Sequence, residues 1–83
     1  MFKIADKVAL YETMLRIALE HVDIVVNKKC ATDILTMAQS YYEDGVYFLT
    51  SGDFVNALVC FSYGYGWLDA GVRVGALHAQ QRE

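Results

Sequence analysis

The sequence contains no proline and no low-complexity segment. Both features commonly mark turns and linkers between structural units. Their absence leaves no point at which the 83 residues would divide into parts. We therefore expect one domain that spans residues 1–83.

Cysteine is scarce as well, since Cys30 and Cys60 are the only two. Their spacing fits no metal-binding motif, so we predict no metal site and no cofactor. We expect both to be reduced thiols in a reducing compartment, which places the protein in the cytoplasm. The first residues also lack the uninterrupted apolar core of a signal peptide.

Long apolar runs and basic runs are both missing. Charged residues interrupt every apolar run well before the roughly 20 residues that a membrane span requires, so we expect no contact with a membrane. The net charge is −3, with both signs spread along the chain. We do not expect nucleic acid as a partner, because binding to phosphates needs clustered positive charge.

Apolar residues are abundant, at 55% of the chain, and they recur every three to four positions in three segments. This period indicates helices at about 4–22, 32–50 and 53–78. Gly52 is expected to end the second helix in a left-handed conformation, and Asp53 to cap the third. Because this connection is short, the two helices should be antiparallel. The sequence thus predicts an all-α, up-down-up three-helix bundle. Residues 24–26 are β-branched, which favours an extended connector over 23–26, but a strand there would have nothing to pair with.

The segment Gly52–Leu77 is apolar on nearly every side. One stripe contains Phe54, Leu58, Phe61, Tyr65, Leu68 and Val72, and a second contains Ala57, Gly64, Trp67, Gly71, Val74 and His78. We predict Gly64, Gly71 and Gly75 as helix-contact positions, because a missing side chain lets another backbone approach closely. The neighbouring helix would belong to the same bundle or to a second chain. So much apolar surface favours a homodimer or another protein partner.

The most varied chemistry also lies in this segment. Tyr63, Trp67, Asp69 and Arg73 are candidate binding residues for a small molecule, a nucleotide or RNA. The competing interpretation is a surface ion pair between Asp69 and Arg73 beside aromatic packing residues. Arg73 and His78 also have the Arg-x-x-x-x-His spacing that one group of helical ribonucleases uses, but this pattern is short and common by chance. We predict no catalytic residue, and we expect His21, which lies on an apolar line, to be a half-buried core residue.

Several motifs resemble an archaeal family catalogued as domain of unknown function 357. They are Tyr42-x-Asp44, Phe48-Leu49, Gly52 to Leu58, and Ser62 to Gly75 with Gly-Trp-Leu-Asp-Ala-Gly at its centre. The chain departs from the family pattern at Gly45 and Gly64, where the pattern has Ala, and at Tyr65, where it has His. The resemblance implies a small helical bundle from an archaeal cytoplasm, and it implies no activity. We therefore expect an uncharacterised, non-enzymatic protein-interaction or self-association module, with the small-molecule, nucleotide or RNA site as the alternative.

Overall fold

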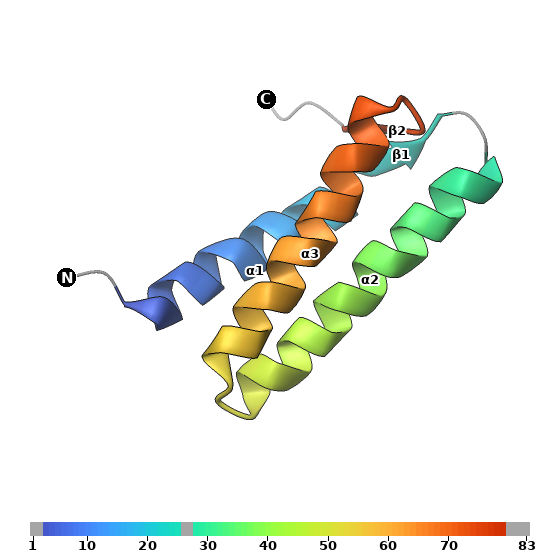
Figure 1. Cartoon of the computed structure of the whole chain (residues 1–83). Helices are drawn as coiled ribbons and strands as arrows, with labels where there is room; N and C mark the ends of the chain where they lie inside the picture. Colours follow the sequence, from blue (N-terminus) through green and yellow to red (C-terminus); the bar gives the residue numbers. More distant parts are fainter. Residues whose placement is uncertain (1–2, 26–27, 80–83) are drawn as a thin grey trace.

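The computed structural model of the chain describes residues 3–25 and 28–79. It consists of three helices and a two-stranded sheet (Figure 1). The helices are α1 (Ile4–Glu20), α2 (Lys28–Thr50) and α3 (Phe54–Arg73), and the strands are β1 (Val22–Ile24) and β2 (Leu77–Ala79). The predicted all-α, up-down-up bundle is confirmed, with the small sheet as an unpredicted addition.

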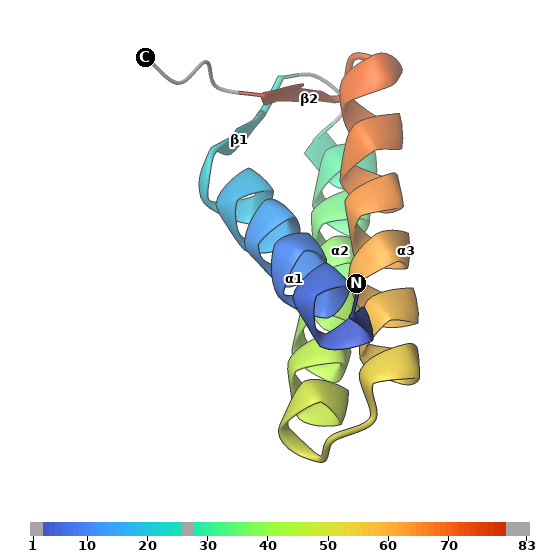
Figure 2. The ribbon, with the colours of Figure 1, turned by 90° about the vertical axis from the view of Figure 1, so that its left-hand side faces the viewer.

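Helices α2 and α3 lie side by side and antiparallel, and α1 crosses them at an angle (Figures 1 and 2). Helix α1 packs mainly against α3 and less against α2. The sheet lies at the end of the bundle where α1 and α3 stop and α2 begins (Figure 1). Among the described residues, no helix is long and apolar enough to cross a membrane.

The connection between α2 and α3 forms as its residues predict. Gly52 has a φ of 82°, and its N–H donates to the carbonyl of Leu49. The N–H of Asp53 donates to the carbonyl of Phe48, which completes a Schellman motif at the end of α2. The Asp53 side chain then accepts a hydrogen bond of 3.1 Å from the Asn56 N–H, which caps α3. Two adjacent residues therefore end one helix and begin the next.

The predicted start of the second helix at residue 32 is wrong, because α2 already begins at Lys28. Ala31 is fully buried in the core, and the helical turn around it allows Lys29 to pair with Asp33 at 3.4 Å. Ala31 and the pair of Lys29 with Asp33 thus lie within the first turns of a helix that starts four residues earlier than predicted. The first helix likewise ends at Glu20 rather than at residue 22.

The predicted end of the third helix at residue 78 is also wrong, because α3 stops at Arg73. Gly75 has a φ of 82°. Its N–H donates to the carbonyl of Val72, and the N–H of Ala76 donates to the carbonyl of Gly71. These bonds form a second Schellman motif, which reverses the chain. The reversal lets β2 pair antiparallel with β1, with Leu77 opposite Ile24. The extended segment after α1 therefore pairs with Leu77–Ala79. The first two of these residues had been predicted to belong to the third helix.

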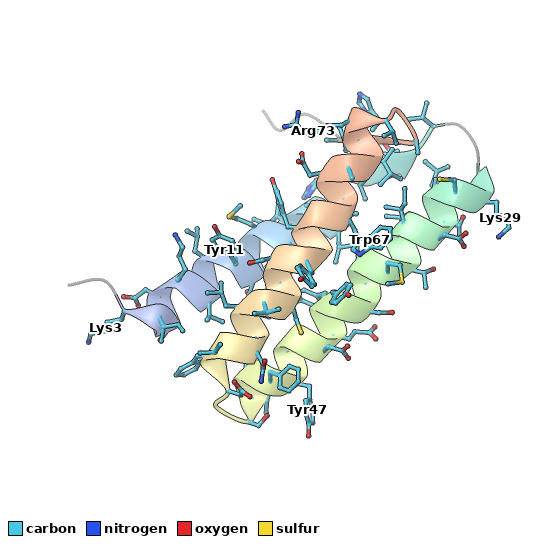
Figure 3. The ribbon with its side chains drawn as sticks, in the orientation of Figure 1. Lys3, Tyr11, Lys29, Tyr47, Trp67 and Arg73 are labelled. Carbon is cyan, nitrogen blue, oxygen red and sulfur yellow. The ribbon has the colours of Figure 1, made fainter. Side chains whose placement is uncertain are left out.

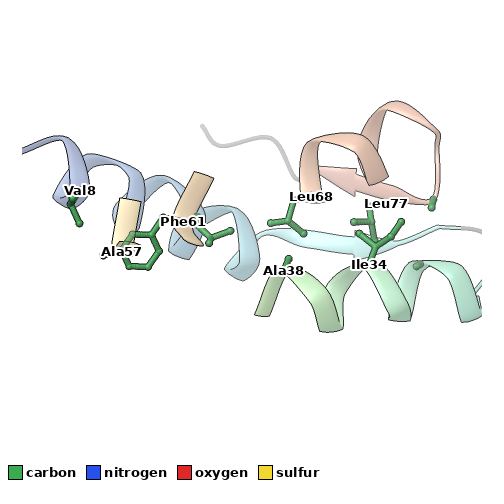
Figure 4. Packing of buried hydrophobic residues seen from close by; sticks show 10 residues of the cluster. Val8, Ile34, Ala38, Ala57, Phe61, Leu68 and Leu77 are labelled. Atoms are coloured by element: carbon green, nitrogen blue, oxygen red, sulfur yellow. The ribbon is translucent and has the colours of Figure 1, made fainter. Parts of the chain in front are cut away.

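The core lies along the line where the three helices meet. Its fully or nearly fully buried side chains are Val8, Leu15, Ala31, Ile34, Ala38, Ala57, Phe61, Leu68, Ala76 and Leu77. Leu68 of α3 and Leu77 of β2 lie over Ile34 and Ala38 of α2 (Figure 4). Helix α3 buries the line Ala57, Phe61, Gly64, Leu68 and Gly71, which runs between the two predicted stripes. Phe54 and Tyr65, which belong to the first predicted stripe, are 36% and 38% exposed.

Candidate functional site

The four predicted binding residues do not share one side of α3. Tyr63 and Trp67 face a groove beside α2, whereas Asp69 lines a groove beside α1. Arg73 pairs with Asp69, its Nε lying 3.0 Å from the carboxylate. Figure 3 shows Trp67 on the α2 side of α3 and Arg73 on the opposite side. The structure therefore forms two pairs, and it forms no single pocket from all four side chains.

The groove between α2 and α3 has aromatic walls and a floor of small residues. It encloses about 360 Å³ and is lined by Tyr41, Ser62, Tyr63, Gly66, Trp67 and Ala70. The rings of Tyr41 and Tyr63 meet edge to face, with centroids 5.6 Å apart. A Cβ built on Gly66 would have no atom within 4 Å, so the backbone of α3 is open to an approaching group.

This groove is part of a longer apolar surface, which we call the outer face of α3. The face comprises Val55, Val59, Ser62, Tyr63, Gly66, Trp67, Ala70 and Val74. Its large apolar side chains are 39–72% exposed, the lowest value being that of Trp67 and the highest that of Val74. None of these eight residues carries a charge. The apolar excess predicted for this segment is thus concentrated on the side of α3 that the rest of the chain leaves open.

The three predicted helix-contact glycines have different surroundings. A Cβ on Gly64 would lie 2.7 Å from Leu15 Cδ2 and 3.3 Å from the carbonyl oxygen of Ala38, so α1 and α2 approach this point closely. A Cβ on Gly71 would lie 2.7 Å from Leu77 Cδ1. Within this chain Gly75 makes no helix contact, since it lies beyond α3 and a Cβ there would meet nothing within 4 Å, and a contact with a second chain stays a prediction. Its positive φ makes Gly75 a helix terminator instead.

A second groove, of about 390 Å³, lies between α1 and α3 next to the sheet. Its lining residues are Thr13, Met14, Ile17, Ala18, His21, Val22, Tyr65, Leu68, Asp69, Val72 and Ala79. Sequence reasoning did not identify this groove, although it placed His21 on an apolar line, which Met14 and Ile17 share. Those residues form one wall because α1 crosses α3 at an angle, which no local pattern reveals. His21 is half-buried, as predicted.

A polar contact fixes α1 against α2 away from both grooves. The Tyr42 hydroxyl donates to Glu12 Oε2 at 2.7 Å, and Arg16 Nε donates to the same oxygen at 3.1 Å. Burial and the neighbouring Glu12 carboxylate together raise the pKa of Tyr42 to about 12. Burial also raises the pKa of the Cys60 thiol, with a smaller contribution from Asp44.

The described residues contain no group of three or more His, Cys, Asp or Glu side chains that could hold a metal ion. His78 lies on β2, exposed and opposite Asp23 of β1. Since α3 ends before it, the helical Arg73–His78 spacing considered from the sequence does not form.

Comparisons with known proteins identify the family. The family model described as "Protein of unknown function (DUF357)" matches residues 10–77. The crystal structure of a DUF357 protein from Archaeoglobus fulgidus has the same fold, with a TM-score of 0.80 over 93% of each chain and 22% sequence identity. No curated protein matches the chain. The family model covers most of the sequence, and the chain therefore belongs to the DUF357 family.

Proposed function

We propose that the protein is a non-enzymatic self-association module in which two copies pair through the outer face of α3. The observation that carries the proposal is the exposure of Val55, Val59, Tyr63, Trp67 and Val74 along one helix. Small monomers rarely expose a contiguous apolar surface of this kind. Contact with a second copy would remove these side chains from water, which stabilises the pair.

The small residues on this face have the arrangement that a symmetric pair requires. Ser62 and Ala70 lie four positions before and four positions after Gly66. If two α3 helices pack antiparallel about a two-fold axis at Gly66, Ser62 of each copy faces Ala70 of the other. A two-fold interface must be self-complementary in this way. Small residues spaced four apart also allow helix backbones to approach closely.

The size of the face fits a modest interface. Helix α3 has 20 residues and is therefore about 30 Å long. With the adjoining strip of α2, about one helix spacing away, the face measures roughly 30 by 20 Å. This is about 600 Å² per copy, the lower end of the range for specific interfaces. We expect a dimer that forms at micromolar concentrations.

Charge does not oppose this pairing. Each copy has a net charge of −3, and the eight residues of the outer face carry no charge, although Arg73 follows Val55 by 18 positions, or about five helical turns, and so borders the face. The nearest charges, Asp69 and Arg73, compensate one another within the same helix. Contact between two identical faces therefore brings no unpaired like charges together.

Sedimentation equilibrium of the wild type and the Ala70→Glu variant tests the proposal. Ala70 is exposed in the single chain, so glutamate costs little there, but in the dimer its carboxylate would be buried without a partner. We expect a wild-type dimer at micromolar concentration and at least tenfold weaker association for Ala70→Glu. Ala9→Glu, at an exposed position of α1, is the matched control and should associate like the wild type. A wild type that stays monomeric at several hundred micromolar, as a rough upper limit, overturns the proposal.

The cytoplasmic location expected from the sequence stays a prediction.

A further inference from the structure

We propose that the groove between α1 and α3 is a binding site for a small apolar amine, a cationic ligand with an aliphatic or aromatic body. This site goes beyond the proposed self-association, because it lies on the other side of α3 and is complete in one copy. Nothing in the proposal depends on a dimer.

The walls of the groove determine the body of the ligand. Most of its lining is apolar, with Met14, Ile17 and Ala18 from α1 facing Leu68 and Val72 from α3. Its volume of about 390 Å³ lies within the range of small-molecule pockets. Since a water molecule occupies about 30 Å³ of liquid, the groove has room for roughly a dozen water-sized groups. A compact ring system with a short side chain is of that size.

The polar atoms of the groove accept hydrogen bonds, which determines the head group of the ligand. The Nδ1 atom of His21 lies 2.8 Å from the carbonyl oxygen of Ile17 and must donate its proton to it. In the neutral imidazole the Nε2 atom is then an acceptor. The Asp69 carboxylate is a second acceptor, of which only Oδ2 contacts Arg73. An N–H group on the ligand is complementary to both.

The backbone adds negative potential at the same place. His21 is the C-terminal cap of α1, and α3 ends one turn beyond Asp69. The C-terminal ends of helices carry a partial negative charge, because their last carbonyl groups have no partner in the helix. Two such ends flank the groove, and the protein as a whole is acidic. Because Asp69 is paired with Arg73, the preference for a cation over a neutral molecule of the same shape rests on these two helix ends and on the other carboxylate oxygen of Asp69.

The same observations argue against a nucleotide or another phosphate ligand here. Among the residues that the structure describes, 3–25 and 28–79, no lysine or arginine lines the groove. Arg73 is outside that set, and its Nε is engaged by Asp69 at 3.0 Å. A phosphate group in the groove would have to compete with the Asp69 carboxylate for Arg73.

Titration of ¹⁵N-labelled protein with tryptamine, followed by amide chemical shifts, tests this site. Indole-3-propionate is the matched control ligand, since it has the same ring and linker length but a carboxylate in place of the ammonium. We expect tryptamine to shift amides of residues 13–22 and 65–72 and to bind at least tenfold more tightly than the propionate. Equal binding of the two, shifts that cluster elsewhere, or no shift at about 10 mM tryptamine overturns the proposal.

Two variants separate a built site from adsorption to apolar surface. Asp69→Asn should reduce the preference for tryptamine over the propionate at least threefold. Asp33→Asn removes a carboxylate that likewise pairs with a cation four positions away, Lys29 on α2, and that is more exposed than Asp69, and it should leave the preference unchanged. If both variants change the preference for tryptamine over the propionate to the same extent, the Asp69 carboxylate does not select the ligand. The result should be the same in the Ala70→Glu background, which tests this site independently of self-association.

Discussion

The two glycines Gly64 and Gly66 lie two positions apart on α3, and the structure predicts opposite effects when each is replaced by alanine. Either substitution stabilises the helix by about 1 kcal/mol through backbone propensity. At Gly66 the new methyl group meets no atom within 4 Å, so this gain is retained. At Gly64 it would lie 2.7 Å from Leu15 Cδ2 and 3.2 Å from Tyr41 Cβ.

The crowding at Gly64 outweighs the gain in propensity. Leu15 is fully buried, and the new methyl group would also lie 3.3 Å from the backbone carbonyl oxygen of Ala38, which cannot rotate away as a side chain can. Inserting a methyl group into a packed core costs about 1–3 kcal/mol. Gly64→Ala should therefore lower the free energy of unfolding by about 1 kcal/mol, while Gly66→Ala raises it by a similar amount. The resulting difference of about 2 kcal/mol corresponds to roughly 10 °C in Tm for a domain of this size.

Urea unfolding of both variants, at the lowest protein concentration that the signal allows, measures the monomer alone. Shifts of the same sign and size at the two positions would refute the assignment of Gly64 to the interior and of Gly66 to the surface. The wild type and the Ala9→Glu variant serve as references with an unchanged core.

Three further predictions concern the caps and the contact between α1 and α2. Tyr42→Phe should cost about 1 kcal/mol in urea unfolding, because it leaves the Glu12 carboxylate without its 2.7 Å donor. Since the folded-state pKa of Tyr42 is about 12 against 10.0 unfolded, this tyrosine makes stability fall between pH 10 and 12. The loss of stability between pH 10 and 12 should be smaller in Tyr42→Phe. If the stability of the variant depends on pH as that of the wild type does, Tyr42 does not make the contact with Glu12. Gly75→Ala should lower Tm by an amount equivalent to about 1–2 kcal/mol, because its φ is 82°. Gly75→Asn should lower it less, and an equal loss would argue against the left-handed conformation. Asp53→Ala should cost about 1 kcal/mol by thermal unfolding, whereas Asp53→Ser should be nearly neutral; equal losses would exclude capping of Asn56.

The parts of the fold that depend only on residues close together in the sequence were predictable from it. Gly52 and Asp53 specify a helix end and a helix start through their own backbone and side-chain chemistry. Three amphipathic periods with a short connection then leave few arrangements other than an antiparallel bundle. The four-spaced pair of Asp69 and Arg73 was equally visible, because one helix contains both partners.

The remainder depends on contacts between distant segments. Gly71 and Gly75 lie four apart in an unbroken apolar pattern, yet only Gly75 ends the helix. That ending is favoured because Leu77 can then pack against Gly71 and Ile34. The sheet pairs Val22 with Ala79, which is too distant in sequence for any local signal. Both grooves arise from the relative positions of whole helices, so the sequence grouped Trp67 with Asp69 although they face different sides.

Disulfide trapping across the proposed two-fold axis tests the central claim, that a second copy covers the outer face of α3, most directly. Gly66→Cys would be made in a background in which serine replaces Cys30 and Cys60. A residue on the axis faces its own copy, within the 4.4–6.8 Å between Cα atoms that a disulfide typically spans. We predict rapid formation of a covalent dimer at micromolar concentration, and no dimer from Thr36→Cys, an exposed position on α2. Failure of Gly66→Cys to cross-link, or cross-linking of both variants at the same rate, would contradict the account.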